Sequence, residues 1–250
     1  MSTPKTLVIV PTYNEVESAP RLISRVAELL SDVHILVVDD GSPDGTANVV
    51  EAMAEGELDG RIHVMRRKEK AGLGAAYLAG FTWGLAHGYE TLIEMDADGS
   101  HRPEDLVRLL EALHADPSID LVIGSRWIKG GSVKNWAKKR EILSRIANKY
   151  AGFLLRSDVK DLTAGFRVFK SSVLRRIDFS SAKSQGYCFQ IEMAQKVLAL
   201  DGKIKEVPIT FVEREFGVSK MNMKIVIEAI LRVTLWGFLS RFFSRDNPSL

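Results

Sequence analysis

The sequence predicts an α/β fold with a mostly parallel central sheet. Short apolar runs rich in β-branched residues alternate with longer amphipathic stretches over the first half of the chain, and this alternation is typical of right-handed βαβ units. With 250 residues, 26% of them charged and 46% hydrophobic, the chain has the composition of a globular protein that can bury a full core. This composition excludes a disordered chain, a collagen-like repeat and a polytopic membrane protein.

The expected strands are short apolar runs, and the expected helices lie between them. The strands are Leu7–Val10, His34–Val38, Ile62–Met65, Thr91–Met95 and Leu121–Ile123. The helices are Ala19–Leu30, Gly45–Glu55, Gly74–His87 and Pro103–Ala115. Because ligands of such sheets bind beyond the carboxyl ends of the strands, the residues that follow each strand are the first candidates for a site.

The second half of the chain opens with a Gly-rich, basic segment at Lys129–Lys139, which predicts a mobile loop that acts as a lid or binding element. We expect a helix over Arg140–Arg156 to follow it. The remaining elements of a domain over residues 1–220 are Arg167–Phe169, a short helix near Ser171–Ile177, a helix near Phe189–Leu200 and a strand near Ile204–Phe211.

Residues 221–250 are predicted as a separate C-terminal element. Within Met221–Phe243 charged residues recur every four positions and the remaining surface is apolar, which predicts an amphipathic helix. Its longest uncharged run, Val233–Ser240, is far shorter than the roughly 20 apolar residues of a membrane span. The helix is therefore not expected to cross a bilayer, and three surfaces remain open to it: the membrane interface, the protein's own core and a partner subunit.

Charge and cysteine content restrict the binding partners and the cellular compartment that we expect for the protein. The net charge of +2 argues against a nucleic-acid-binding polycation, although basic residues cluster after Arg126 and near the C-terminus. The single cysteine, Cys188, excludes an internal disulfide and a cysteine metal cluster, and it is typical of a reducing compartment. The apolar run Leu7–Pro11 is too short for the core of a secretion signal. We therefore expect a cytoplasmic protein without a nucleic-acid partner.

Acidic residues follow two of the expected strands, as Asp39-Asp40 and as Asp96-Ala97-Asp98. If the chain stays extended, Asp96 and Asp98 point the same way and share one divalent cation. In sugar transfer from a nucleotide diphosphate such a cation neutralises the leaving group. The alternative is that these residues only shape turns and cap helices. Their convergence at one edge favours a metal-dependent glycosyltransferase.

Two other nucleotide-binding folds are disfavoured. Gly72 and Gly74 resemble part of the glycine motif of dinucleotide-binding folds. The third glycine of that motif is missing, and the segment follows the third strand instead of the first. The phosphate-binding loop of kinases and ATPases, Gly-x-x-x-x-Gly-Lys-Ser/Thr, is absent from the sequence.

A series of motifs runs along the chain: PTYNE at Pro11–Glu15, VVDDGSPDGT at Val37–Thr46, GLG at Gly72–Gly74, DADGSH at Asp96–His101, GSRW at Gly124–Trp127 and GFRVF at Gly165–Phe169. In this order they resemble family 2 glycosyltransferases, and in particular the polyprenol-phosphate (dolichol-phosphate) mannose synthases. The resemblance covers about Thr6 to Met221. It implies a GT-A fold, the Rossmann-like nucleotide-diphospho-sugar transferase fold. It also implies transfer of mannose from GDP-mannose, with Mg²⁺ or Mn²⁺ and with inversion, to a polyprenyl phosphate.

The resemblance also assigns site residues. Those matching the nucleotide-sugar positions are Pro11, Tyr13, Glu15, Asp39, Asp40, Gly72, Asp96, Ala97, Asp98, Arg214 and Lys220. The catalytic positions are Asp98, Arg126 and Arg214, and the lipid-phosphate positions are Arg126, Arg140 and Ser144. The metal positions are Asp96, Asp98 and Ser100, but family members often carry Gln where this chain has Ser100, which leaves the third ligand open.

The basic residues agree with a phosphate acceptor on physical grounds. A lipid phosphate is already an anionic nucleophile near neutral pH, so positioning and charge neutralisation suffice without a strong general base. We expect Arg126 and Arg140 to grip it in fork-like fashion, with Ser144 one helical turn from Arg140. Taken alone, Arg140 beside Lys138 and Lys139 is a solvated basic helix end.

Some choices remain open at this point. His101 either shapes the acidic turn or binds metal, Asp161 either orients Arg167 or touches the acceptor, and Glu192 either packs or faces the sugar. The rival functions are a UDP-glucose-dependent polyprenyl-phosphate glucosyltransferase and a non-catalytic nucleotide-binding membrane scaffold. The expected partners are GDP-mannose, a polyprenyl phosphate, the cytoplasmic face of a membrane as a peripheral contact and, if one exists, a separate membrane-anchoring protein.

Overall fold

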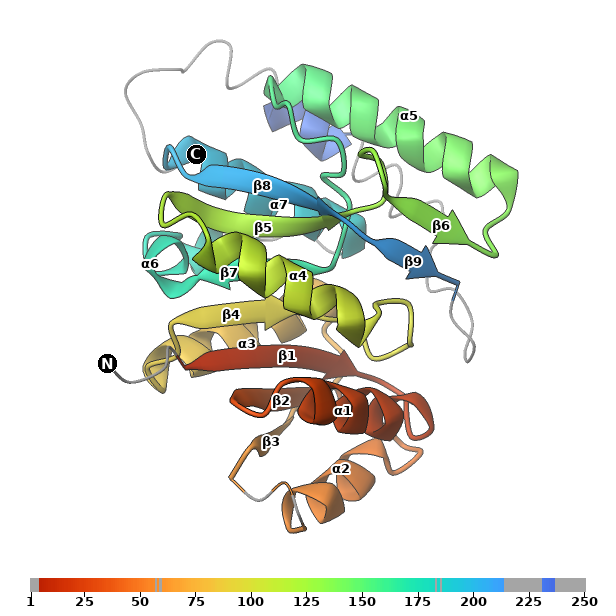
Figure 1. The fold of residues 1–250 in the computed structure, drawn as a ribbon, viewed down its shortest axis with the longest axis vertical. Helices are drawn as coiled ribbons and strands as arrows, with labels where there is room; N and C mark the ends of the chain where they lie inside the picture. Colours follow the sequence, from red (N-terminus) through yellow and green to blue (C-terminus); the bar gives the residue numbers. More distant parts are fainter. Residues whose placement is uncertain are drawn as a thin grey trace.

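A computed structural model describes residues 5–56, 58, 60–182, 184, 186–213 and 231–236. These residues form a seven-stranded sheet of order β3-β2-β1-β4-β7-β5-β8 (Figure 1). The strands are β1 (Thr6–Thr12), β2 (Val33–Asp39), β3 (Ile62–Arg66), β4 (Thr91–Glu94), β5 (Ile119–Ser125), β7 (Arg167–Lys170) and β8 (Lys203–Pro208). All neighbours pair in parallel except β7, which runs antiparallel between β4 and β5. The predicted, mostly parallel sheet is confirmed.

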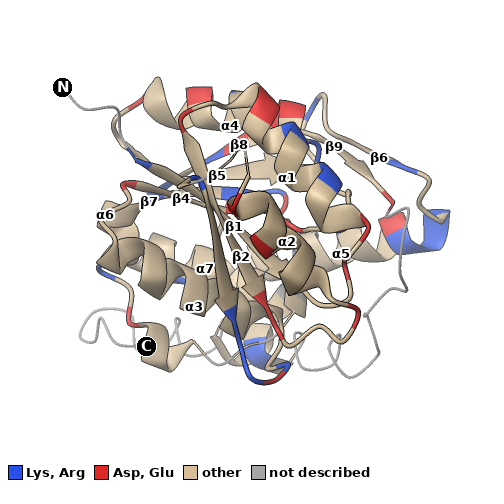
Figure 2. Ribbon diagram, turned by 90° about the horizontal axis from the view of Figure 1, so that it is seen from below, with Lys and Arg blue, Asp and Glu red and all other residues tan. Residues whose placement is uncertain are grey.

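Helices cover both faces of the sheet, as Figures 1 and 2 show. One face carries α1 (Ser18–Leu29), α2 (Thr46–Ala54) and α4 (Pro103–His114), and the other carries α3 (Leu73–Ala86), α6 (Ser171–Leu174) and α7 (Gly186–Ala199). A short 3₁₀-helix spans Phe179–Ser181. The four helices predicted in the first half of the chain are all present, and each end lies within one residue of the prediction.

The two halves of the core follow from the alternation of side chains along β1. Val8 and Val10 are buried against α1 and α4, whereas Leu7 and Ile9 are buried against α3 and α7. On α3 a Cβ atom at Gly80 would lie 2.5 Å from Cγ2 of Ile9. The helix therefore packs so closely on the sheet that this position has no room for a side chain. The burial of β1 on both faces explains why its sequence is a continuous apolar run.

A second small sheet lies at the carboxyl edge. β6 (Ser132–Lys134) pairs in parallel with β9 (Thr210–Val212), and α5 (Lys138–Leu155) follows β6. The prediction of a loop over Lys129–Lys139 was therefore wrong in its middle, where three residues form a strand. The strand predicted near Ile204–Phe211 is divided at Ile209, whose backbone N–H binds Ser125 and whose carbonyl accepts from Ser132.

Most of the predicted C-terminal helix lies outside the described residues. Residues 231–236 are described, and they are helical and lie beside α5. Val233 is buried in a cluster with Ala151 and Leu162, and the Tyr150 hydroxyl lies 2.7 Å from that of Thr234. This part of the chain docks on the protein's own core, while Leu231 and Leu235 stay exposed. Among the described helices, none has the length and apolar character that a membrane span requires.

Candidate active site

The carboxyl ends of β1 and β2 meet at Asp39. The Thr12 hydroxyl donates to the Asp39 carboxylate at 2.9 Å, and both the backbone N–H and the hydroxyl of Ser42 donate to it as well. Gly41, at a φ of 73°, makes the turn that brings Ser42 back onto Asp39. Asp39 is 2% exposed, so the strand ends hold a fixed, buried carboxylate.

Asp40 holds the neighbouring loop in place. Its carboxylate pairs with Arg67 at 2.9 Å and accepts backbone hydrogen bonds from Ala71 and Gly72. Burial raises the pKa of Asp40, and the Arg67 charge opposes that rise. Gly72, at a φ of 94°, precedes the first residue of α3. These contacts agree with a turn-forming role for Asp40, and a direct nucleotide contact of Asp40 stays a prediction.

The predicted nucleotide residues that follow β1 line the same edge. The Lys70 ammonium lies 3.9 Å above the ring of Tyr13. Glu15 accepts a hydrogen bond from the Ser18 hydroxyl, and its backbone N–H donates to Thr46 at the start of α2. Pro11 lies opposite Val38 in the β1–β2 pairing. The structure therefore brings Pro11, Tyr13, Glu15 and Asp39 to one end of the sheet.

The acidic turn after β4 is organised by Tyr77 and His101. The Tyr77 hydroxyl donates to Asp96 Oδ1 at 2.9 Å, and Nδ1 of His101 accepts the backbone N–H of Asp96 at 3.0 Å. Burial lowers the pKa of His101, so its ring is neutral and its Nδ1 is free of a proton. His101 therefore shapes the turn, the first of the two roles considered for it. Ala97 is buried between the two aspartates.

The donor set of this turn fits a hard divalent cation. The Asp96 side chain is 30% exposed, and Asp98 accepts the backbone N–H of Ser100 at 3.0 Å. Carboxylate oxygens are the ligands that Mg²⁺ and Mn²⁺ prefer. Ser100 is 1% exposed and its carbonyl accepts from the N–H of Val212, so its backbone fixes the turn while its hydroxyl stays a predicted ligand. No group of three or more His, Cys, Asp or Glu side chains in the described ranges forms a metal cluster.

A buried carboxyl and a buried guanidinium lie beneath this turn. Glu94 and Arg167 face each other across the β4–β7 pairing, and both are 0% exposed. The Arg167 guanidinium donates to the carbonyls of Ala164, Leu162 and Gln190 at 2.7 to 2.8 Å. Burial raises the pKa of Glu94 to about 8, although the positive charge of Arg167 opposes the rise.

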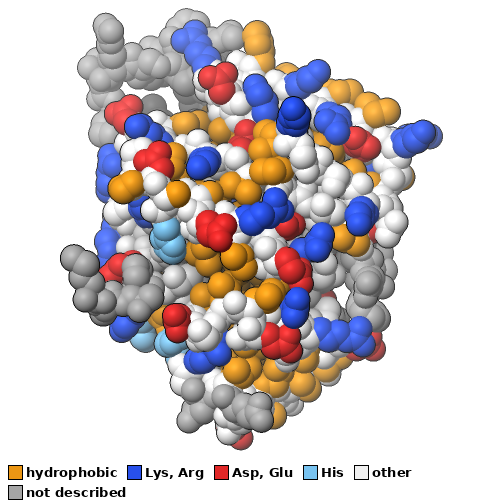
Figure 3. Space-filling view, in the orientation of Figure 1, with side chains coloured by type: hydrophobic (Ala, Val, Ile, Leu, Met, Phe, Trp, Pro, Cys, Tyr) orange, Lys and Arg blue, Asp and Glu red, His pale blue; other side chains and the backbone are white. Residues whose placement is uncertain are grey.

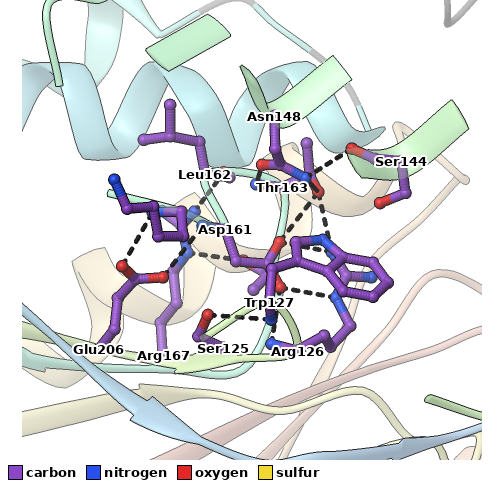
Figure 4. A network of polar contacts seen from close by, with 12 residues as sticks. Ser125, Arg126, Trp127, Ser144, Asn148, Asp161, Leu162, Thr163, Arg167 and Glu206 are labelled. Atoms are coloured by element: carbon purple, nitrogen blue, oxygen red, sulfur yellow. Dashed lines mark hydrogen bonds and ion pairs between the residues drawn. The ribbon is translucent and has the colours of Figure 1, made fainter. Parts of the chain in front are cut away.

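Arg126, at the end of β5, forms a fork with Asp161 (Figure 4). Its Nε and Nη2 donate to the two carboxylate oxygens at 2.8 and 2.7 Å, and its backbone N–H donates to Oδ2 at 2.9 Å. The two side chains are 3% and 0% exposed. Asp161 thus orients Arg126, which differs from the predicted alternative in which it orients Arg167. The fork expected for an incoming phosphate is made here to Asp161.

Aromatic rings surround the Arg126 guanidinium. It lies 5.2 to 5.5 Å from the ring centres of Trp127, Trp136 and Phe211. Phe211 also packs edge-on against His101, with ring centroids 5.6 Å apart. One phenyl ring therefore contacts both the acidic turn after β4 and the basic centre after β5.

The other predicted phosphate residues lie on α5. Arg140 pairs with Glu213 and stacks over Trp136 at 4.0 Å, and Ser144 is half-buried one turn further along the helix. Figure 2 shows basic residues at this end of α5. Arg140 and Arg126 thus share Trp136. Arg214 and Lys220 lie outside the described residues.

Several residues at the site could not be predicted from sequence motifs. Tyr77, Arg67 and Thr163 lie in segments without a motif that assigns them a polar role. Asn148 carried a signal, because Arg140, Ser144 and Asn148 are spaced by four along one helix face. Glu192 accepts the backbone N–H of Ser184 at 3.1 Å, an internal contact that fits packing.

Comparisons with known proteins agree with this arrangement. The model of glycosyl transferase family 2 matches residues 7–178. The polyprenol monophosphomannose synthase of Mycolicibacterium smegmatis is 53% identical over 239 residues, which cover 96% of this chain and 89% of that protein. The undecaprenyl-phosphate mannosyltransferase of Micrococcus luteus is 47% identical over 238 residues, covering 95% and 96%.

Solved structures share the fold at low identity. Glucosyl-3-phosphoglycerate synthase from Mycobacterium tuberculosis, in complex with phosphoglyceric acid, is 18% identical with a TM-score of 0.67, over 98% of this chain and 82% of that one. A mannosyltransferase from Pyrobaculum calidifontis, in complex with GDP-mannose and Mn²⁺, is 19% identical with a TM-score of 0.62, over 99% and 67%. The GT-A fold is confirmed, and with these relatives and this carboxyl edge the chain belongs to glycosyl transferase family 2 and is a glycosyltransferase.

Proposed function

We propose that this chain transfers mannose, with inversion, from GDP-mannose to the phosphate of a polyprenyl lipid. The observation that carries the proposal is the shared contact of Phe211 with His101 and with Arg126, because it places the carboxylate turn and the arginine centre side by side. The names and high identity of the relatives from M. smegmatis and M. luteus support mannose as the sugar and a polyprenyl phosphate as the acceptor. The complex of the P. calidifontis mannosyltransferase supports GDP-mannose as the donor.

Each part of the edge has a proposed role in the reaction. A Mg²⁺ or Mn²⁺ ion held by Asp96 and Asp98 supplies charge neutralisation for the leaving diphosphate. Asp39, fixed by Thr12 and Ser42, offers an acceptor for the nucleoside. The Tyr77 hydroxyl holds one oxygen of Asp96 and so orients that carboxylate.

The basic centre is proposed to receive the acceptor phosphate. Arg126 and Arg140 lie around the same ring, Trp136, and Ser144 follows on α5. Positive charge there offsets the repulsion between an incoming phosphate and the diphosphate of the donor. Because the phosphate oxygen is already charged, alignment by these residues replaces deprotonation by a base.

A lipid acceptor requires contact with a membrane, and we propose the outer face of α5 for it. Ile142, Ile146 and Phe153 are 58%, 58% and 72% exposed, and Leu143 and Tyr150 lie beside them. The spacing of three and four residues puts these side chains on one stripe. Figure 3 shows Lys and Arg side chains with hydrophobic side chains between them on the part of the surface over α5. An apolar stripe flanked by cations suits a peripheral contact with an anionic membrane face.

The test is transfer by the purified protein. With Mg²⁺ or Mn²⁺ we expect transfer of labelled mannose from GDP-mannose to undecaprenyl phosphate in vesicles, and little transfer from UDP-glucose. Faster transfer from UDP-glucose would replace this proposal with the glucosyltransferase. Absence of transfer from either donor, together with absence of GDP-mannose binding, would refute it. Because no other protein is present, vesicle binding in the same assay separates direct membrane contact from contact through an anchoring partner.

A further inference from the structure

We propose that Thr163 and Asn148 are positioning residues for the acceptor, because they fix the distance between Arg126 and helix α5. The proposal rests on the proposed function, which makes Arg126, Arg140 and Ser144 the phosphate-binding residues. It adds two residues that belong to no motif of the sequence and that act through Arg126 and α5 (Figure 4).

The Thr163 hydroxyl uses every hydrogen-bonding position that it has. It accepts from Nη2 of Arg126 at 2.8 Å and from Nδ2 of Asn148 at 3.0 Å, and it donates to Oδ1 of Asp161 at 3.2 Å. A hydroxyl has one proton and two acceptor positions, so all three are occupied. The Thr163 hydroxyl therefore joins the guanidinium of Arg126, which follows β5, to the amide of Asn148 on α5.

The amide of Asn148 likewise uses all its hydrogen-bonding groups. Its Nδ2 donates to the carbonyl of Ser144 at 2.9 Å as well as to Thr163, and its Oδ1 accepts the backbone N–H of Thr163 at 3.1 Å. These partners fix the orientation of the amide, because both amide hydrogens and the oxygen are used. Asn148 lies four residues from Ser144 and eight from Arg140, so it lies on the face of α5 that carries both.

The other end of the network is anchored in the main sheet. Glu206 of β8 accepts the backbone N–H groups of Lys160 and Asp161 at 2.8 and 3.0 Å. Asp161 in turn receives Arg126 through three bonds. The segment that carries Thr163 is thus held by the sheet, and through Thr163 it holds α5.

Asn148 is the buried polar attachment of helix α5, whose other contacts include the Arg140–Glu213 pair, the Tyr150–Thr234 bond and the packing of Ala151. Of its 18 residues, Asn148 and Ala151 are the buried ones, and its outer face carries the exposed apolar stripe. Loss of the bonds at one of these two buried positions is expected to loosen the middle of the helix. Loss of the Thr163 hydroxyl therefore moves Arg140 and Ser144 relative to Arg126, while the acidic turn on β4 and its Tyr77 contact remain in place.

The experiment compares Thr163→Val with Thr163→Ser, which restores the hydroxyl. We expect Thr163→Val to raise the KM for undecaprenyl phosphate about tenfold, as the loss of a charged hydrogen bond implies. The Kd for GDP-mannose should stay within about twofold. Thr163→Ser should return the KM most of the way to the wild-type value. Thr82→Val is a matched control, because the Thr82 hydroxyl binds only the carbonyl of Leu78 on exposed α3 surface.

A second variant and a second measurement guard against simple unfolding. Asn148→Asp keeps the shape of the side chain and removes both donors, so it should raise the same KM. Hydrogen exchange of the backbone amides of α5 should accelerate in Thr163→Val and in Asn148→Asp. This measurement does not depend on the transfer assay. An unchanged KM with unchanged α5 exchange, or an equal loss of GDP-mannose binding, would overturn the inference. Absence of transfer by the wild-type protein would instead count against the proposed function.

Discussion

The hydroxyl of Tyr77 donates a 2.9 Å hydrogen bond to Asp96, and thereby ties a helix on one face of the sheet to the acidic turn at its edge. Burial raises the pKa of Tyr77 well above its ordinary value, with the Asp96 charge as a second cause. The hydroxyl is therefore a permanent donor at physiological pH. It holds one oxygen of Asp96 in a fixed direction, and in the proposed metal site this bond would set the position of the cation.

Tyr77→Phe removes this bond and keeps the ring that packs against Phe81 and Phe189. We expect the Mn²⁺ concentration for half-maximal GDP-mannose binding to rise about threefold to tenfold, because Asp96 loses the hydrogen bond that orients its carboxylate. Calorimetric titration measures it. Tyr150→Phe is the matched control, since that hydroxyl binds Thr234 far from the turn. An unaltered metal requirement in Tyr77→Phe would show that the bond does not position Asp96.

Asp98→Asn tests the second carboxylate. The amide oxygen of Asn can still accept the N–H of Ser100, so the turn should persist while the negative charge is lost. We expect transfer to fall about 100-fold or more, since charge neutralisation at the diphosphate depends on the bound ion. The thermal midpoint should change by only a few degrees. Near-normal transfer would place the metal elsewhere.

Glu94→Gln tests the buried carboxyl. Its pKa is raised to about 8 by burial, above the ordinary 4.5, with Arg167 lowering it and the charge of Asp96 raising it. A raised folded-state pKa means that the folded protein binds the proton more tightly than the unfolded chain. The wild-type free energy of unfolding should therefore fall between about pH 5 and pH 8 from this group.

The Gln side chain cannot ionise, so this part of the pH dependence should disappear in Glu94→Gln. We expect its stability relative to wild type to grow by about 1–3 kcal/mol between pH 5 and pH 8. Urea unfolding at several pH values measures the difference. A constant difference across this window would mean that Glu94 does not titrate there.

The apolar stripe of α5 predicts vesicle binding. Ile146→Glu combined with Phe153→Glu should weaken binding to anionic vesicles at least about tenfold, because two exposed apolar side chains become charged. Transfer to a short, water-soluble polyprenyl phosphate should be nearly unchanged. Val49→Glu is the control, since Val49 is 38% exposed on α2 at the opposite end of the sheet. Equal vesicle binding by the double variant would move the membrane contact elsewhere.

The strands and helices of the first half were predictable because each is a local pattern. β1 and β2 are continuous apolar runs, and α4 begins at Pro103 with Glu104 and Asp105 in its first turn. β6 was not predictable, because three residues become a strand only through pairing with β9, more than 70 residues later. Its Gly-rich neighbourhood has the composition of a loop.

The site was predictable in its positions and less so in its contacts. The motifs predicted that Asp39, Asp96 and Arg126 lie at one edge of the sheet, and the sheet topology places the ends of their strands there. The partner of Arg126 was not predictable, because Asp161 lies 35 residues away and its backbone is held in place by Glu206 of β8, still further along the chain. The same holds for Asp40, whose carboxylate is engaged by Arg67.

The antiparallel strand β7 keeps opposite charges apart. Because it lies between β4 and β5, the acidic turn and Arg126 start from strands two sheet spacings apart, about 10 Å. At that separation the aspartates and the arginine do not collapse into an ion pair with each other, and each finds its own partner in Tyr77 or in Asp161. A single inserted strand thus leaves the acidic turn and the arginine centre as two neighbouring regions of opposite charge. In the proposed reaction the metal-bound diphosphate of the donor would lie at the first region and the acceptor phosphate at the second.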